Sequence, residues 1–187
     1  MNTATIIQLL RHGTQLKQTA RTGWVQRGVV QPENVAAHSY GVTFTALLLA
    51  QLIDQSLDLG KLLAIATLHD LPEGLTTDIP SPAWRFLPDG SKEATERMAM
   101  ETILDGVSFA TALMAYWEEL HANETVESRL VHDADKIDML LQAVIYEEQT
   151  RNQHLSEFWH KPFTFFYPES QAIYEELRQQ HNALRGS

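Results

Sequence analysis

Apolar residues recur at helical spacing through most of this chain, and this periodicity constrains the fold more than any other feature. Short alternating runs of β-branched residues between turns, which would indicate strands, are nearly absent. Asn34, Ser91 and Asn123 stand where helix N-caps are expected. The fold class that follows is all-α, a helical bundle. The pattern predicts helices over residues 3–18, 34–54, 59–70, 91–105, 108–121, 124–151 and 169–183.

Two segments interrupt the helical pattern. The first, ARTGWVQRGVVQPEN (20–34), contains two glycines and a proline and is expected to be an irregular connection. The second, GLTTDIPSPAW (74–84), contains two prolines and cannot form a long helix. Both segments carry charged or aromatic residues. Because loops held by a rigid scaffold often carry function, both are candidates for a site.

The chain has 187 residues, the length of one ordinary domain. No internal repeat, low-complexity tract or linker divides it. We therefore expect a single domain over residues 1–187, with a core over about 5–150 and a C-terminal helical extension over about 151–187. The aromatic residues of that extension suggest packing or self-association.

Composition narrows the classes of partner. The net charge of −10 argues against a general binder of nucleic-acid polymers or of membrane surfaces, since both need a basic face. The absence of cysteine excludes disulfides and thiolate metal sites. The N-terminus lacks the features of a signal peptide, and the run FTALLLAQLI is half the length of a membrane span. We therefore expect a cytoplasmic protein.

The stretch LLAIATLHDLPEGLTTDIP (62–80) places ionisable groups at the end of an apolar helix. An unpaired charge in an apolar setting costs several kcal/mol, so such groups usually have a partner or bind a metal. Two other predicted helices show the same feature, and a cation bound between helices would explain all three. The ionisable residues concerned are His69, Asp70, Glu73 and Asp78, then His38, and then His132, Asp133, Asp135 and Asp138.

Two His and two Asp, with water in the remaining positions, form a mixed nitrogen and oxygen set that suits Mn²⁺, Fe²⁺, Co²⁺, Ni²⁺ or Zn²⁺. The HExxH, EF-hand and P-loop motifs are absent. Other interpretations are a hydrogen-bonded core histidine, a helix C-terminal histidine and a solvated acidic face. Helical phase places Asp133 and Asp138 nearer the apolar stripe than Asp135, so periodicity does not select a ligand among these acids.

Four segments resemble a known family. RTGWVQRGV, PENVAAHSYGV, LHDLPEGLTTDIPSP and DADKIDMLLQA resemble, in the same order, segments of the HD superfamily of metal-dependent phosphohydrolases. They are most similar to the branch that contains the bacterial 5′-deoxynucleotidases, over roughly residues 5–150. The resemblance implies one divalent metal ion, with Mg²⁺ also a candidate. It implies the metal ligands His38, His69, Asp70 and Asp135.

The resemblance also implies roles for the two loops. Glu73 matches an acid that positions or activates water, and Asp78 matches an acid near the substrate sugar and phosphate. Trp24 matches an aromatic residue of the nucleotide pocket, although a loop Trp can equally be a core anchor. The family's nucleotidases can carry an Arg directly before this Trp, where this chain has glycine. Arg21 and Arg27 are the expected substitutes.

The implied activity is hydrolysis of deoxyribonucleoside 5′-monophosphates to deoxynucleoside and phosphate, and the family also implies a homodimer. One alternative is a phosphodiesterase, a triphosphohydrolase or a phosphatase of another small phosphate. A second alternative is a metal- or nucleotide-sensing module without turnover. HD phosphodiesterases with two metals need further His ligands. Here only His121 and His132 lie in the relevant interval, outside any matching motif, so a single metal is expected.

Overall fold

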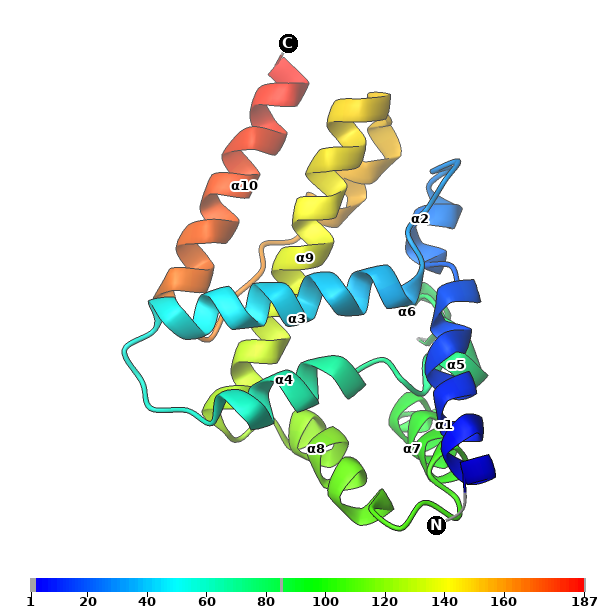
Figure 1. Cartoon of the computed structure of the whole chain (residues 1–187). Coiled ribbons are helices and arrows are strands. Elements are labelled where there is room, and N and C mark those ends of the chain that lie inside the picture. The colour runs from blue at the N-terminus through cyan, green and yellow to red at the C-terminus, as the bar shows by residue number, and fades with distance from the viewer. Residues whose placement is uncertain (1–2, 85, 187) are drawn as a thin grey trace.

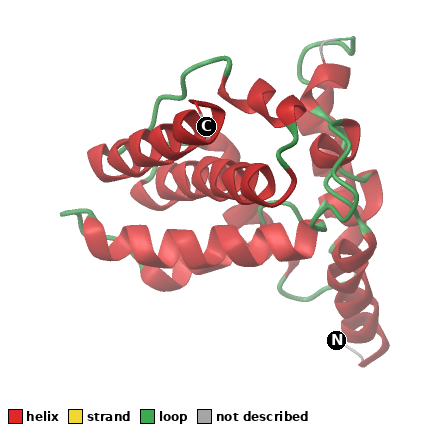
Figure 2. Cartoon of the chain, turned by 90° about the horizontal axis from the view of Figure 1, so that it is seen from above, coloured by secondary structure: helices red, strands yellow, loops and turns green. Residues whose placement is uncertain are grey.

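The computed structural model describes residues 3–84 and 86–186, and every regular element within them is helical (Figures 1 and 2). Ala20 and Asn34 form an isolated antiparallel bridge. The predicted all-α class is confirmed. The elements are α1 (Thr3–Gln15), η1 (Leu16–Gln18), α2 (Thr22–Gln26), α3 (Val35–Leu52), α4 (Leu59–Leu68), α5 (Glu73–Thr76), α6 (Ser81–Trp84), α7 (Ser91–Ile103), α8 (Ala110–Ala122), α9 (Val126–Thr150), η2 (Gln153–Trp159) and α10 (Pro168–Gly186).

Helices α3, α4 and α9 form the centre of the bundle, and each packs against the other two (Figure 1). Helix α10 packs along α9, and α8 packs against both α4 and α9. Helices α1, α5 and α7 pack in sequence to one side of this centre. The crossing of α3 and α9 beside the end of α4 brings together segments that are far apart in the chain.

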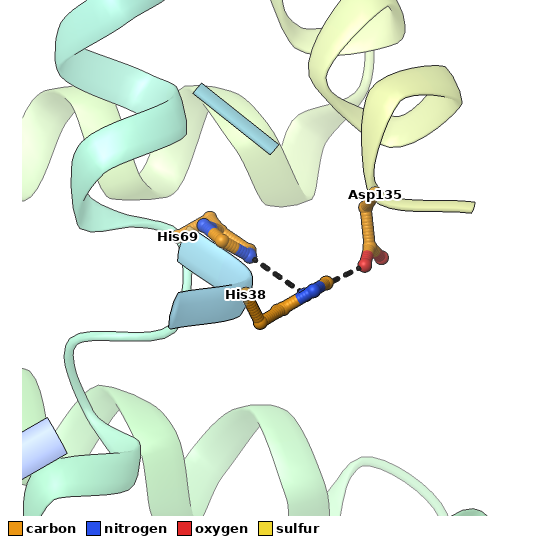
Figure 3. Close-up of side chains that lie close together, drawn as sticks. All are labelled: His38, His69 and Asp135. Atoms are coloured by element: carbon orange, nitrogen blue, oxygen red, sulfur yellow. Dashed lines mark hydrogen bonds and ion pairs between the residues drawn. The ribbon is translucent and has the colours of Figure 1, made fainter. Parts of the chain in front are cut away.

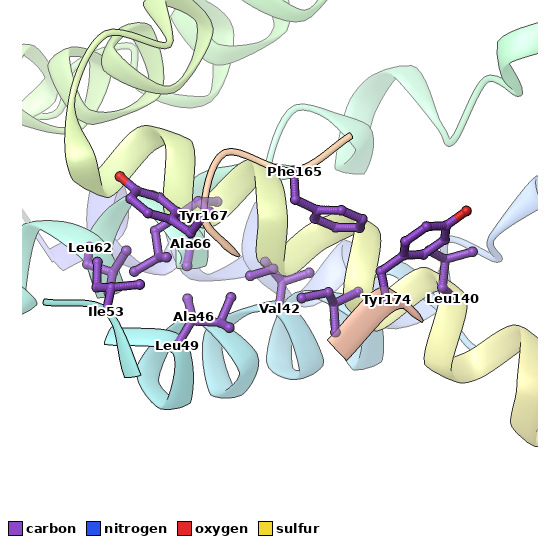
Figure 4. Packing of buried hydrophobic residues seen from close by; sticks show 14 of the residues in the cluster. Val42, Ala46, Leu49, Ile53, Leu62, Ala66, Leu140, Phe165, Tyr167 and Tyr174 are labelled. Carbon is purple, nitrogen blue, oxygen red and sulfur yellow. The ribbon is translucent and has the colours of Figure 1, made fainter. Parts of the chain in front are cut away.

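The main core lies between α3, α4, α9 and the C-terminal segment (Figure 4). Val42, Ala46 and Leu49 point inward from α3 at four- and three-residue intervals, as an amphipathic helix requires. Full burial of one such aliphatic side chain contributes about 1.5–3 kcal/mol. Because this core is continuous across three helices, it holds their relative positions and so fixes the site at their crossing.

Helix α3 is long and apolar enough to cross a membrane by length and composition, with a mean hydropathy of 1.3 over 18 residues. The helix is longer than the apolar run of ten residues on which the expectation was based. A core helix of a soluble bundle meets the same criterion. Here α3 packs against α4, α9 and α10, and it carries the fully buried imidazole of His38.

Two of the three expected N-caps were wrong. The side chain of Asn34 does cap α3, by accepting a hydrogen bond from the N–H of Ala37. Asn123 instead ends α8 in the left-handed conformation, and Thr125 caps α9 in a capping box. Gly90 precedes α7, which makes Ser91 the first residue of that helix.

The first interrupting segment was expected to be irregular, and it contains the short helix α2. The second segment contains only the single-turn helices α5 and α6, in agreement with its prolines. The C-terminal extension returns over α9, and its Tyr167, Tyr174 and Leu177 belong to the main core. The expected packing of these aromatic residues is therefore present within the chain.

Candidate active site

Side chains from α3, the end of α4 and α9 meet where these helices cross (Figure 3). His38 Nε2 is 3.5 Å from His69 Nε2 and 3.1 Å from Asp135 Oδ1. Asp70 Oδ2 is 3.6 Å from His38 Nε2 and 3.3 Å from His69 Nε2. The structure thus brings the four expected metal ligands together from three segments.

The hydrogen bonds of the two imidazoles make this cluster suitable for a cation. His69 Nδ1 lies 2.7 Å from the carbonyl oxygen of Ala66, which only accepts, so Nδ1 carries the proton. His38 Nδ1 lies 2.8 Å from a carboxylate oxygen of Asp138, and the same reasoning applies. In the neutral rings both Nε2 atoms then present lone pairs to each other and to two carboxylates. A divalent cation satisfies all four groups, so these residues fit a metal.

Charges within the cluster shift its pKa values. Burial and Arg21 lower the pKa of His38, but hydrogen bonds to Asp135 and Asp138 raise it to about 10. Burial raises the pKa of Asp70, but the neighbouring imidazoles and Arg21 hold it well below its ordinary range. Burial also raises the pKa of Asp135, yet the hydrogen bond and charge of His38 bring it to about 2. Without metal, His38 therefore carries a proton that a metal ion would displace.

Asp133, Asp135 and Asp138 on α9 contact three different groups. Asp133 is fully buried, and its carboxylate accepts hydrogen bonds from two backbone N–H groups of the C-terminal extension. Asp135 lies at Nε2 of His38, whereas Asp138 lies at Nδ1 of the same ring. Helical phase could not choose among these acids. The geometry places Asp135 with the other expected ligands.

Glu73 begins α5 and is only 7% exposed. Its Oε2 is buried and has no hydrogen-bond partner among the residues that the structure describes. Burial raises the pKa of Glu73 to about 9, the charges of Asp70 and Asp78 add to this effect, and Arg21 and Lys92 oppose it. A carboxyl group with a free buried oxygen can hold a proton or bind a water molecule at this position.

A cavity of about 160 Å³ lies beside the cluster. Arg21 lines the cavity, and its Nη1 is 3.5 Å from Asp70 Oδ2, so one guanidinium connects the cavity to the expected ligands. Besides Arg21, the residues that line the cavity are Gly23, Trp24, Arg27, Asp78, Pro80, Met139 and Phe158. The three expected substrate-binding residues and Asp78 therefore surround a single space.

A model of the HD domain matches residues 13–174 of the chain. The chain belongs to the HD-domain family. The membership that the sequence motifs indicated is confirmed.

The HD-domain protein has similar relatives along most of its length. The 5′-deoxynucleotidase HDDC2 of Xenopus laevis is 34% identical over 179 residues, which cover 91% of this chain and 87% of that protein. The 5′-deoxynucleotidase HDDC2 of Homo sapiens is 30% identical over 181 residues, which cover 95% and 86%. The solved structure of a conserved hypothetical protein from Pyrococcus furiosus is 37% identical with a TM-score of 0.79, and the match covers 92% of this chain and 99% of that one.

Within this HD domain, two of the expected substrate-binding residues already have partners. Trp24 is 1% exposed, and its Nε1 donates a hydrogen bond to Glu33 Oε1 at 2.9 Å. Arg27 forms an ion pair with Glu157 at 3.0 Å and lies over the ring of Phe158. Trp24 therefore forms a wall of the cavity and anchors the core beside it. Of the two expected arginines, Arg21 is the one whose guanidinium contacts the metal cluster, through Asp70.

Asp78 joins the two interrupting segments. Its Oδ2 accepts a hydrogen bond from the backbone N–H of Thr22 at 2.6 Å, and its carbonyl oxygen accepts one from the hydroxyl of Thr22. Thr22 is the first residue of α2, so the carboxylate also lies at the positive end of that short helix. The contact holds the segment of Arg21 and Trp24 in place. The expected role of Asp78 at the substrate stays a prediction.

Two residues of the site were missed by the sequence reasoning. Asp138 was noted only as an acid near an apolar stripe, although a buried acid on such a stripe indicates a specific partner. Lys92, on α7, was not noted. Its Nζ pairs with Glu96 at 3.6 Å. Burial lowers the pKa of Lys92, but the negative charges of Glu96, Asp70 and Glu73 raise it, so its cation acts on the acids of the site.

Proposed function

We propose that this HD-domain protein is a metal-dependent 5′-deoxynucleotidase that hydrolyses deoxyribonucleoside 5′-monophosphates. The observation that carries the proposal is the convergence of two imidazoles and two carboxylates beside a cavity that Arg21 connects to them. The names of the relatives, which are 5′-deoxynucleotidases, support the choice of substrate class.

His38, His69, Asp70 and Asp135 would hold one divalent cation. When bound, the cation supplies positive charge that polarises a phosphoryl oxygen and lowers the pKa of water. The mixed nitrogen and oxygen ligands favour Mn²⁺, Fe²⁺, Co²⁺, Ni²⁺ or Zn²⁺, and Mg²⁺ is the further candidate. Two other histidines are engaged elsewhere, since His121 Nδ1 and His132 Nε2 each lie within 3.0 Å of a backbone carbonyl. Their positions support a single metal.

Arg21, Glu73 and Asp78 would each contact a different part of the substrate or of the attacking water. Arg21 donates hydrogen bonds to the phosphate, where a guanidinium neutralises developing negative charge. Glu73 exchanges a proton through its free Oε2, either with the attacking water or with the departing 5′ oxygen. Asp78 lies on the cavity wall, where a sugar hydroxyl would be recognised. The cavity volume of about 160 Å³ is about half of the lower bound for small-molecule sites, which is about 300 Å³, so the cavity would enclose only part of a nucleotide.

The test is phosphate release from paired deoxy- and ribonucleoside 5′-monophosphates, after chelation and re-addition of single divalent metals. We expect turnover that requires metal and is confined to the deoxy series. Turnover of other small phosphates alone would favour the broader phosphatase or phosphodiesterase alternative. Metal and nucleotide binding without product from any substrate would favour a sensing module. Metal analysis that gives two ions per chain would contradict the single site.

Arg21 and Arg27 should respond differently to substitution. Arg21→Ala is expected to lower kcat/KM by about 10- to 100-fold, because a charged hydrogen bond contributes about 1.5–3 kcal/mol. Arg27→Ala should lower it less than about fivefold, since its guanidinium is already engaged by Glu157, the carbonyl oxygen of Gly23 and the ring of Phe158. The measurement is kcat/KM of the two variants by steady-state kinetics at saturating metal. An equal or larger loss in Arg27→Ala would assign phosphate recognition to Arg27.

We further propose a cytoplasmic homodimer in which a second copy covers an apolar stripe of α3. Tyr40, Phe44, Leu48 and Leu52 form this stripe at four-residue spacing, and each is 49–72% exposed. A groove of about 600 Å³ between α1 and α3 adjoins it. Contiguous exposed apolar side chains of this extent are uncommon on monomers and mark interaction surfaces.

Phe44→Glu is expected to convert the dimer to a monomer, because it places a charge in the middle of the α3 stripe. Sedimentation velocity at micromolar concentration measures the change. Val30→Glu is the matched control, since Val30 is 93% exposed and lies outside the stripe. A wild-type chain that sediments as a monomer, or a Phe44→Glu variant that remains a dimer, would contradict this interface.

A further inference from the structure

Asp138 approaches His38 from the side opposite the other ligands. Its Oδ2 lies 2.8 Å from Nδ1 of the fully buried imidazole, one hundred residues away in the sequence. No motif or spacing in the sequence indicates that Asp138 and His38 are in contact. We propose that Asp138 is a positioning residue that keeps a proton on Nδ1 of His38, so that Nε2 is the nitrogen that gives up its proton to the metal, and that Gly41 is present to admit Asp138.

The chemistry requires a partner of this kind. A neutral imidazole can carry its proton on either nitrogen, and the nitrogen that holds the proton cannot bind a metal. Asp135 lies 3.1 Å from Nε2 and would itself accept a hydrogen bond from an Nε2–H tautomer. Without Asp138, that competing tautomer would be the favoured one. A carboxylate at Nδ1 reverses the preference, orients the ring and makes Nε2 a stronger ligand.

Gly41 supplies a second and independent observation. It lies within α3, where glycine is about 1 kcal/mol less favourable than alanine. A Cβ atom at this position would lie 2.0 Å from Asp138 Oδ1 and 2.7 Å from Asp138 Cγ, distances that real Cβ atoms do not show. The space that glycine leaves is therefore occupied by the carboxylate that contacts His38. A helix-destabilising residue at this point is explained by the approach of Asp138.

The inference rests on the proposed metal site, and the experiment separates the two. The dissociation constant for Co²⁺ is measured by competition with a chromophoric chelator, beginning with the wild-type chain. Asp138→Asn and Asp138→Ala are expected to weaken Co²⁺ binding by about 10- to 100-fold. A wild-type chain that binds no Co²⁺ would overturn the metal site itself. An affinity in Asp138→Asn within about threefold of wild type would overturn only the role of Asp138.

Asp133→Asn is the control for a merely structural effect on α9. Its carboxylate binds the backbone of the C-terminal extension, so we expect a lower melting temperature with unchanged Co²⁺ affinity. The Zn²⁺-loaded protein gives a spectroscopic readout, because a ring N–H that donates to a buried carboxylate gives a downfield, slowly exchanging proton resonance. That resonance of His38 should be present in the wild type and absent in Asp138→Ala. Its persistence in Asp138→Ala would contradict the proposal.

Gly41→Ala tests the second half of the proposal. It should weaken Co²⁺ binding about as much as Asp138→Ala does, and the double variant should be no weaker than the single ones, because both lose one interaction. Gly13→Ala is the matched control, since Gly13 lies in α1 with nothing within 4 Å of an added Cβ. Gly41→Ala with wild-type affinity would show that Asp138 does not need this space.

Discussion

Asp70→Asn is expected to lower kcat/KM by more than about 100-fold and to weaken metal binding in parallel. A residue that only hydrogen-bonds to a metal ligand already contributes about 10- to 100-fold, so loss of a ligand should exceed that range. The substitution keeps the volume of the side chain but removes the charge that balances the cluster. Kinetics and Co²⁺ affinity are measured on the same preparation.

The position of Asp70 explains why the effect should be large. Its Oδ2 lies within 3.6 Å of three cationic or metal-binding atoms, on His38, His69 and Arg21. Neutralising this carboxylate removes one ligand and releases Arg21 from its ion pair at the edge of the cavity. Both the metal and the group expected to bind the phosphate are therefore affected by one change.

Asp105→Asn is the control for loss of an acidic charge, since Asp105 is exposed and follows the C-terminal end of α7 in the sequence. It should leave both kcat/KM and Co²⁺ affinity within about twofold of wild type. If Asp70→Asn retained full turnover at saturating metal, Asp70 would not be a ligand. The site would then have to be redefined around the remaining three residues.

The periodicity of apolar residues predicted the helices well because the bundle buries one face of most of them. It predicted the helix ends less well. Asn123 was read as the cap of the following helix, but asparagine tolerates the left-handed conformation and so ends α8 at φ 54°. The true cap of α9 is Thr125, two residues later. A single polar residue between two helices does not show which of them it serves.

The candidate site was predictable to the extent that ionisable groups stand within apolar helices. His38, His69 and Asp70 could be singled out as candidates on that basis, with a core or helix-terminal histidine as the alternative. The family resemblance was needed to assign them as ligands and to choose Asp135. The choice between Arg21 and Arg27 depended on neighbours far along the chain, Asp70 for one and Glu157 for the other. The partner of His38 Nδ1 is likewise a tertiary contact. No local pattern encodes such pairings.

Glu73→Gln is expected to abolish most turnover while it stabilises the metal-free protein at alkaline pH. General acid–base catalysis by a positioned carboxyl group contributes about 10²- to 10⁴-fold, and kcat should fall within that range. The gain in stability follows from the environment of the same carboxyl group. Burial and the charges of Asp70 and Asp78 disfavour its ionised form, although Arg21 and Lys92 oppose them.

The sign of the pH dependence follows from the raised pKa. The pKa of Glu73 is about 9 in the folded protein against 4.5 for the ordinary group, so the folded state binds the proton more tightly between those values. Stability therefore falls as the pH rises from about 4.5 towards 9, and it is unaffected by this group below about 4.5. Glutamine cannot ionise, so Glu73→Gln removes this loss of stability at high pH.

In chelated protein, Glu73→Gln should melt above wild type at pH 8, by about 1.4 kcal/mol for each pH unit over which the folded carboxyl group alone keeps its proton, and close to wild type at pH 5. Glu101→Gln, at an exposed position on α7, should show no such pH-dependent difference. Saturating metal should shrink the difference at pH 8, because a nearby cation favours the ionised carboxyl group. A Glu73→Gln variant that melted below wild type at pH 8 without metal would show that this carboxyl group is stabilised as an anion, and its assignment as the proton carrier would be withdrawn.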